Sequence, residues 1–599
     1  MDALWASTWF WATLFVVSSF FNFRAAFKLL IDWKGMATTC RFVEDAYERV
    51  DELPDEDALD REAAAPVFLH LVPAYQEPDI AHTLKALLGS RYPHGKLHVV
   101  VVTKDEEDRA PHPAMEVSTA ELVRRFRAEL PPWQQKMLSL EVMPGRGRKA
   151  EQLNFALRPG FVRGLLNGHS DPTRVYVGVS DADSIPDRNV YRWIAADVLG
   201  GAGSLAYQGV TLSLANFERL PLRGRVCAVQ QSSIFIRVSI ARLLNERKRI
   251  ALFERFAALA PRLARLVRPV FEFCFRRAQI CLGHNQFVRL DTLQALGGFP
   301  TVGATEDSTL GYALAARGVL IAAMPLLELN DMPETTEKMV RQNARWYKGV
   351  LDDVGFLRTI WGAAPNAFNA AQLCRHVGNK VVEWPIAAVV YPVIGFLGWH
   401  LAYRFSDHPV LFVLGITFPS VSLGLTIWVG GIVTQELIEG LTPYFPRPVE
   451  IARTSLKAKF FGTFRCQTYW LLATRGAWRV LWALARTGRF EAAKTDRAIR
   501  TTAAAVGVAS CLALAAACTL PPLELPHSAP GQRFADRGLR VIGTIASVEP
   551  RMGLALVDFP FGRLPLTMTP SDLAQLRAGE AVVFDHDLKP LWDERSGAG

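Results

Sequence analysis

Four long stretches without a charged residue constrain this chain more than any other feature of its sequence. They cover Leu4–Phe23, Trp384–Tyr403, Val410–Thr434 and Thr501–Leu520, and each has 20 residues or more. A helix of about 20 apolar residues crosses a bilayer, so we expect four transmembrane helices. The rest of the 599 residues is ordinary polar sequence, enough for a large soluble domain and a smaller one. This composition excludes a disordered, collagen-like or disulfide-stapled chain.

The charges beside these stretches predict a topology. Arg24, Lys28 and Lys34 follow the first stretch, so the positive-inside rule places residues 24–383 in the cytosol. Residues 435–500 carry 12 Lys and Arg against 5 Asp and Glu, which again indicates the cytosol, and 521–599 would then lie outside. We expect a multi-pass protein of the cell inner (plasma) membrane with a cytosolic body. Anchoring beside the bilayer explains the net charge of +9, and no nucleic-acid partner is predicted.

The cytosolic segment begins with an alternation of strands and helices. Short runs rich in β-branched residues at Val67–Pro73, Leu97–Thr103, Leu138–Met143 and Val175–Asp181 are separated by helical stretches. This pattern predicts an α/β, Rossmann-like domain with a mostly parallel sheet, which binds ligands at the carboxyl ends of its strands. The polar residues that follow these strands are Tyr75, Gln76, Glu77, Asp105, Asp181 and Asp183. A loop after a strand is often polar without any function, so each residue alone leaves that alternative open.

Three short motifs carry more specific chemistry. Asp181-Ala182-Asp183 follows a buried strand, and two such carboxylates can hold a divalent cation that bridges a diphosphate; the alternative is a solvated turn. Thr305-Glu306-Asp307 precedes a helix, where a carboxylate can also act as a cap. Gln342-Asn343-Ala344-Arg345-Trp346 combines a guanidinium with an indole, suited to a phosphate and a sugar ring. Its alternative is a Trp that anchors a helix at the membrane surface.

Taken in order, the motifs resemble one enzyme family. They are Val72-Pro73-Ala74-Tyr75-Gln76-Glu77-Pro78, Gly147-Arg148-Lys149-Ala150-Glu151-Gln152-Leu153-Asn154, Asp181-Ala182-Asp183, Gly283-His284-Asn285, Thr305-Glu306-Asp307 and Gln342-x-x-Arg345-Trp346. The chain resembles the membrane-embedded, inverting family 2 glycosyltransferases, the group that contains cellulose, hyaluronan, chitin and mannan synthases. The resemblance covers roughly residues 65–500.

The resemblance implies a GT-A catalytic domain that uses a nucleotide-sugar donor, with a UDP-sugar favoured over a GDP-sugar, and Mg²⁺ or Mn²⁺. Asp307 would be the general base, next to Glu306. Donor-binding residues implied by the motifs are Tyr75, Glu77, Asp105, Lys149, Asp181, Gln342 and Arg345. Asp183, together with Asp181, would hold the metal. The acceptor, a glycan or a lipid-linked group, would meet Trp346, His284 and Asn285.

The expected organisation follows from the spans and the resemblance. Its segments are a transmembrane helix (1–23), the GT-A domain (24–336), interfacial helices (337–383), a transmembrane hairpin (384–434), a basic amphipathic segment (435–500), a fourth span (501–520) and a C-terminal part (521–599). The favoured function is a polysaccharide synthase that exports its product through its own helices. The alternatives are a single-transfer enzyme with a lipid acceptor, and a non-catalytic subunit or receptor of an export complex.

The C-terminal part is expected to be a small β-rich domain outside the cytosol. Arg540–Val548, Leu554–Asp558 and Ala581–Asp585 have the pattern of short strands, and Ser571–Arg577 that of a helical turn. A domain of this size buries only a small core, so we expect it to dock on the exit side of the hairpin or on an extracytoplasmic export partner. The alternative is a cytosolic regulatory cap.

Overall fold

The computed structural model describes most of the chain in two units, Met1–Arg500 and Thr501–Gly599. The described residues are 8–487, except for 110–114, 146, 167–170, 202, 276–280, 304, 364–366 and 452–455, and then 490, 541–549, 554–559, 562–567, 574 and 581–584.

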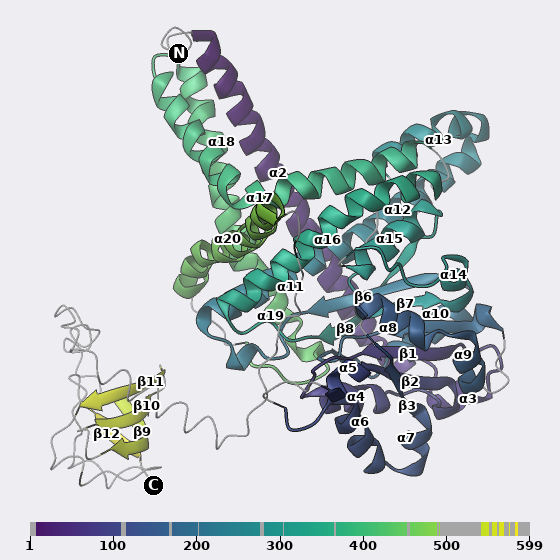
Figure 1. Ribbon diagram of the computed structural model, residues 1–599. Coiled ribbons are helices and arrows are strands. Elements are labelled where there is room, and N and C mark those ends of the chain that lie inside the picture. The colour runs from purple at the N-terminus through teal and green to yellow at the C-terminus, as the bar shows by residue number, and fades with distance from the viewer. Residues whose placement is uncertain are drawn as a thin grey trace. The chain divides into compact units, whose positions relative to one another are not determined.

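An eight-stranded mixed sheet forms the centre of the first unit (Figure 1). Its order is β3-β2-β1-β4-β7-β6-β8-β5. The strands are β1 (Val67–Pro73), β2 (Leu97–Lys104), β3 (Leu138–Met143), β4 (Val175–Val179), β5 (Ile185–Pro186), β6 (Ala206–Leu212), β7 (Gln286–Arg289) and β8 (Ile321–Leu329). The first four strands pair in parallel, and so do β6 and β8. The α/β fold predicted from the sequence is therefore present.

The sheet is less uniformly parallel than the alternating pattern predicts, because β7 runs antiparallel to both β4 and β6. After β6 the chain makes a long helical excursion, through α11 (Leu222–Ile234), α12 (Ala241–Leu259) and α13 (Pro261–Phe275). It returns at the carboxyl edge of the central strands, where Gly283 meets Lys149. β7 starts near this edge, where β4 ends, and it therefore runs antiparallel to β4.

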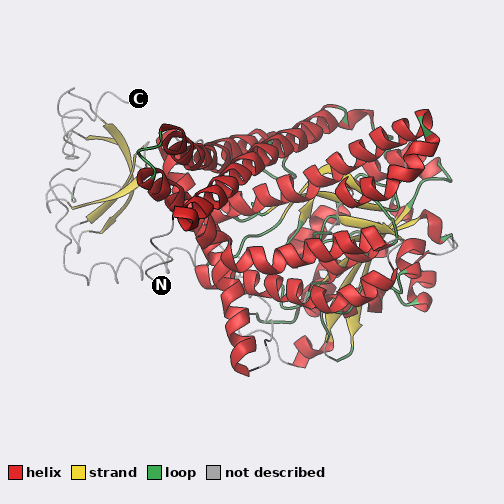
Figure 2. Cartoon of the chain, turned by 90° about the horizontal axis from the view of Figure 1, so that it is seen from above, coloured by secondary structure: helices red, strands yellow, loops and turns green. Residues whose placement is uncertain are grey.

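Short helices cover the sheet on both faces (Figure 2). Side chains alternate along β1, so that Leu69 and Leu71 enter one apolar cluster while Phe68 and Val72 enter another. Both faces of the sheet are therefore buried, as expected for parallel strands. The helices are α4 (Ile80–Leu88), α5 (Asp105–Arg109), α6 (Thr119–Ala128), α7 (Pro132–Met137), α8 (Lys149–Ala156), α9 (Pro159–Leu166), α10 (Val190–Leu199), α14 (Leu290–Ala295) and α15 (Glu306–Ala316).

Longer helices extend beyond the sheet. They are α2 (Thr8–Glu48), α16 (Thr336–Ala363), α17 (Ala367–Arg404), α18 (Pro409–Ile427) and α20 (Leu456–Thr487), and the short α19 (Thr434–Gly440) lies between α18 and α20 in the chain. In Figure 1, α2 and α18 run side by side away from the sheet. A Cβ at Gly415 of α18 would lie 2.7 Å from the Cβ of Ala402. Ser18 and Asn22 of α2 donate to the Ile394 carbonyl of α17 at 3.0 and 3.2 Å. Small residues and inter-helix hydrogen bonds of this kind are typical of helices packed in lipid.

Two helical segments in the described part of the chain are long and apolar enough to cross a membrane, by length and composition. They are Trp9–Glu48 and Pro409–Tyr444, which contain most of the first predicted stretch and all of the third. The second predicted stretch, Trp384–Tyr403, lies within α17, which is not one of these two segments. The fourth, Thr501–Leu520, lies outside the described residues.

Four antiparallel strands are described in the second unit, in the order β11-β10-β9-β12. They are β9 (Val541–Glu549), β10 (Leu554–Phe559), β11 (Gly562–Thr567) and β12 (Ala581–Phe584). Three of them lie where the sequence predicts strands, and β11 was not predicted. The predicted helical turn at Ser571–Arg577 lies outside the described residues except for Ala574.

Candidate active site

Lys149, the first residue of α8, joins three separate loops at the carboxyl edge of the sheet. Its Nζ donates to Asp181 Oδ1 at 2.7 Å and to the Gly283 carbonyl at 2.6 Å. The same nitrogen lies 3.1 Å from Glu306 Oε1. Burial by itself would lower the pKa of Lys149, but the charges of Asp181 and Glu306 outweigh burial and raise it. Lys149 is therefore a fixed cation in the middle of the predicted acidic residues.

Asp307 lies next to this cation, in the first turn of α15. Its Oδ1 accepts a hydrogen bond from the Ser308 amide at 2.8 Å. A Cβ at Gly283 would stand 2.8 Å from Asp307 Oδ2, and Gly283 has a φ of +76°, so only glycine suits this position. Burial raises the pKa of Asp307 to about 6, the charge of Glu306 also raises it, and Lys149 opposes both. Such a carboxylate is ionised at neutral pH and still basic enough to accept a proton.

Asp181 and Asp183 flank the turn that follows β4. Asp183 is 7% exposed, and its Oδ2 accepts from the Asp331 amide at 3.1 Å. Within the described ranges, no group of three or more His, Cys, Asp or Glu side chains is placed to hold a metal ion. A donor set of two carboxylates nevertheless suits Mg²⁺ or Mn²⁺, since these ions commonly take their other ligands from phosphate oxygens and water.

A buried carboxylate, Glu328 of β8, supports the loops around these residues. It accepts from Ser180 Oγ at 2.8 Å and from Ser184 Oγ at 3.1 Å, on either side of the Asp181-Ala-Asp183 turn. His284 Nδ1 lies 2.5 Å from Glu328 Oε1. Burial would lower the pKa of His284, but the hydrogen bond and charge of Glu328 raise it. Glu328 therefore ties the Asp181-Ala182-Asp183 turn to the loop that carries Gly283.

Asn285 lies in the same loop and is held by hydrogen bonds to backbone carbonyls of the sheet. Its Nδ2 lies 3.2 Å from the Val210 carbonyl and 3.3 Å from the Leu326 carbonyl, and the residue is 2% exposed. Its φ of +49° is unusual for a residue other than glycine, and these hydrogen bonds hold it there. The side chains of His284 and Asn285 thus make supporting contacts beneath the site. Their predicted contact with an acceptor stays a prediction.

The family comparison covers the part of the chain that contains these residues. Residues 65–349 match the family model described as "Glycosyltransferase like family 2". This segment is a family 2 glycosyltransferase domain. No curated protein matches the chain.

Solved structures with similar folds include a mannosyltransferase, PcManGT, from Pyrobaculum calidifontis in complex with GDP-Man and Mn²⁺. It is 16% identical, with 77% of this chain and 99% of that chain covered and a TM-score of 0.38. S. aureus TarS 1–349 is 15% identical, with 71% and 92% covered and a TM-score of 0.32. The same TarS fragment in complex with UDP-GlcNAc is 14% identical, with 62% and 92% covered and a TM-score of 0.31.

Three of the predicted donor-binding residues, Tyr75, Glu77 and Asp105, directly follow β1 and β2. Lys104 Nζ lies 4.4 Å from the centre of the Tyr75 ring. The buried Glu77 donates its amide to Thr119 Oγ1 at 2.9 Å. Asp105 Oδ1 accepts from the Gly145 amide at 2.9 Å, which links the loops after β2 and β3. Gln76 between Tyr75 and Glu77 has a φ of +53°, a strained conformation of the kind that clusters at functional sites.

The third motif lies on α16, whose middle packs against the start of α15. A Cβ at Gly349 would stand 2.1 Å from Thr305 Oγ1, so the two helices are in close contact just before Glu306. Gln342, Arg345 and Trp346 are half-buried. Among the described residues, no hydrogen bond or ion pair joins Arg345 or Trp346 to Lys149 or its carboxylates. The structure therefore brings together the acidic residues and not this motif.

Several supporting residues were not assigned a role from the sequence. Gln152 Nε2 donates to the Ala74 carbonyl at 3.0 Å and to the Val102 carbonyl at 2.8 Å, and so joins the two donor loops. Glu328 could have been recognised, because a single carboxylate in the apolar run of β8 needs a buried partner. Asp353 accepts from Ser308 and Thr309 at 3.3 and 3.2 Å. Its position in an amphipathic helix gave no such signal.

Proposed function

We propose that the chain is a membrane-bound, inverting glycosyltransferase that moves a sugar from a nucleotide-sugar donor to a growing polysaccharide. The observation that carries this proposal is the half-buried cluster in which Lys149 lies between Asp181 and Glu306, with Asp307 beside it. A base, a fixed cation and a pair of carboxylates suited to a metal are the parts that such a transfer needs, and they come from separate loops of the family 2 domain.

Each residue then has a place in one displacement step. Asp307 takes the proton of the acceptor hydroxyl as its oxygen attacks the anomeric carbon of the donor sugar. The bond from that carbon to the diphosphate oxygen breaks on the opposite face, so the configuration inverts and the nucleoside diphosphate leaves. Lys149 and Arg345 would bind the leaving diphosphate. A Mg²⁺ or Mn²⁺ ion bound by Asp183 and Asp181 would neutralise charge on that diphosphate.

The donor loops would hold the nucleoside. Tyr75 offers a ring face, and Glu77 and Asp105 offer carboxylates to base and ribose. Gln342 and Trp346 would complete the site from α16, with the indole under the acceptor sugar. We propose a UDP-sugar as the donor, with a GDP-sugar as the alternative.

The membrane placement is part of the proposal. It is supported by Trp9–Glu48 and Pro409–Tyr444 and by the small-residue packing of α2, α17 and α18. We propose that the hairpin of α17 and α18 belongs to the path by which a polymer leaves the cytosol. The second candidate, transfer of one sugar to a lipid acceptor, needs the helices only as anchors.

We further propose that the strands β9–β12 belong to a small domain outside the cytosol. A reporter fused after Gly599 tests this placement. Alkaline phosphatase active there, with green fluorescent protein dark, would support it. The reverse result would place the domain beside the catalytic site as a cytosolic cap.

One assay tests the proposed reaction. Purified membranes are incubated with a panel of labelled UDP- and GDP-sugars with Mg²⁺ or Mn²⁺, and the product is sized on gels. A long, membrane-associated polymer from one donor supports the synthase. A single sugar on an extractable lipid supports the second candidate, and transfer from none of the donors contradicts both.

A further inference from the structure

Helix α20 has one face that is buried against α16. Ala477 and Val480 are fully buried in an apolar cluster with Ala344 and Tyr347 of α16. A Cβ at Gly476 would stand 2.8 Å from the Ala344 amide nitrogen, so the two backbones are in close contact at this point. This face of α20 packs against α16, the helix that carries Gln342, Arg345 and Trp346.

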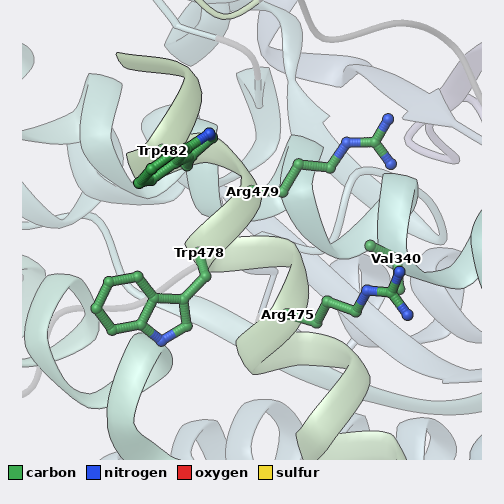
Figure 3. A pocket seen from close by; sticks show the side chains of 5 residues that line it. All are labelled: Val340, Arg475, Trp478, Arg479 and Trp482. Atoms are coloured by element: carbon green, nitrogen blue, oxygen red, sulfur yellow. The ribbon is translucent and has the colours of Figure 1, made fainter. Parts of the chain in front are cut away.

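The opposite face of α20 is exposed and combines aromatic with cationic side chains. Trp478 is 56% exposed and Trp482 is 70% exposed. With Arg475 and Arg479 they recur at helical spacing and line a groove of about 450 Å³ together with Val340 of α16. Figure 3 shows the two indoles on one flank of α20 and the two guanidinium groups on the other. Large indoles in contact with water are unfavourable, so this surface is suited to an occupant that is part apolar and part charged.

The charge of the groove favours an anion. Arg479 lies 2.5 Å from Glu337 Oε1, and Arg341 lies 3.2 Å from the same oxygen. In the part of the chain that the structure describes, Arg475 lines the groove and forms no ion pair. Three guanidinium groups thus meet one carboxylate, and the excess positive charge lies at the groove. A planar guanidinium matches the oxygens of a phosphate.

The groove lies where α17 enters its long apolar stretch. Trp478 Nε1 donates to the Pro385 carbonyl at 3.0 Å, and Thr474 Oγ1 donates to the Trp384 carbonyl at 3.2 Å. Trp384 is the first residue of the second predicted span, which continues to Tyr403. If that stretch enters the bilayer, these hydrogen bonds hold the groove at the level of the lipid headgroups, where Trp and Arg side chains are both favoured.

We propose that this groove binds an anionic phospholipid, with the headgroup phosphate between Arg475 and Arg479 and the glycerol and first methylenes against Trp478 and Trp482. The inference rests on the proposed membrane placement and is independent of the donor and product. The two flanks together select this occupant. Free phosphate would leave the indoles exposed, and a zwitterionic lipid would bring its own cation next to the two guanidinium groups. A lipid bound there would contact both α20 and Val340 of α16.

The test measures lipid binding directly. The full-length protein in detergent is titrated with phosphatidylglycerol or phosphatidylcholine, and bound lipid is counted by native mass spectrometry. We expect phosphatidylglycerol to bind at least tenfold more tightly. The double variant Arg475→Gln/Arg479→Gln should lose most of this preference, and Trp482→Ala should weaken binding of both lipids. The matched control Arg124→Gln/Arg125→Gln, on exposed positions of α6, should behave as wild type.

Three results would overturn the inference. They are equal affinity for the two lipids, an unchanged preference in the Arg475/Arg479 variant, and loss of the bound lipid to millimolar inorganic phosphate alone. Thermal melting shows whether a variant is folded, and the lipid preference of the wild type does not depend on any variant. Recovery of the chain in the soluble fraction would refute the membrane placement itself. A membrane-bound chain without lipid preference would refute only this inference.

Discussion

The protonation of Asp307 gives the sharpest prediction, because Glu306 and Lys149 shift its pKa in opposite directions. Its pKa is raised to about 6, by burial first and then by Glu306, while Lys149 lowers it. A general base works only when deprotonated. In kcat/KM, which reports the free enzyme, activity should therefore fall as the pH drops through a midpoint near this pKa. Lys149→Met should move the midpoint up, and Glu306→Gln should move it down.

The size of these shifts follows from Coulomb's law. Unit charges about 8 Å apart interact by about 2 kcal/mol at an effective dielectric constant of about 20, which corresponds to roughly 1.5 pKa units. At pH 7, the Asp307 carboxylate of the wild type would be about nine-tenths ionised, and that of Lys149→Met only about a quarter. Lys149 also binds the diphosphate, so its loss lowers the rate at every pH as well.

The assay is initial-rate sugar transfer at limiting donor concentration, measured from about pH 5 to pH 8. The midpoint of the acid limb is compared among the wild type, both variants and Lys136→Met, which removes an exposed lysine of α7 and should change nothing. Shifts of the two variants in the same direction would refute the reasoning. So would a midpoint that stays fixed while the rate falls.

Three further predictions concern the metal and the support of the site. Asp183→Ala should lower metal-dependent transfer by about 10²-fold or more, and full activity in this variant or in EDTA would contradict the assignment. Gly349→Val should lower the free energy of unfolding by about 1–3 kcal/mol in thermal melts, since the valine side chain would overlap Thr305. The control Gly424→Ala has open space around it and should leave the stability unchanged. Glu328→Gln should lower the free energy of unfolding by about 1–3 kcal/mol, because the amide cannot accept all three hydrogen bonds that the carboxylate accepts. An unchanged melting temperature would contradict this role.

The sequence predicts those parts of the fold whose pattern is local. β1 and β3 begin and end at the predicted residues, because each is a short apolar run between polar turns. The strand pattern predicts that Asp181 lies at the carboxyl edge of the sheet, and there it pairs with Lys149. Lys149, Glu306 and Asp307 are assigned to the site by the resemblance to family 2 glycosyltransferases, and not by the strand pattern.

The parts that sequence could not predict depend on distant partners or on weak local signals. Glu328 meets His284 and Ser180, which are 44 and 148 residues away in the chain. β11 contains Pro565, which lacks an amide donor and speaks against a strand, yet β11 is tolerated as an edge strand of its sheet. The groove on α20 exists only because Gly476 brings this helix against α16. The spacing of apolar residues along α20 does not indicate that α16 is its neighbour.

The most direct test of the central claim is sugar transfer by Asp307→Asn, measured with the donor that the wild-type protein uses. The amide keeps the shape of the carboxylate but cannot take a proton, so we expect a loss of about 10²–10⁴ in kcat with donor affinity retained. Asp57→Asn, at an exposed position of the sheet domain, should match the wild type. Turnover by Asp307→Asn within about tenfold of the wild type would contradict the assignment of Asp307 as the base.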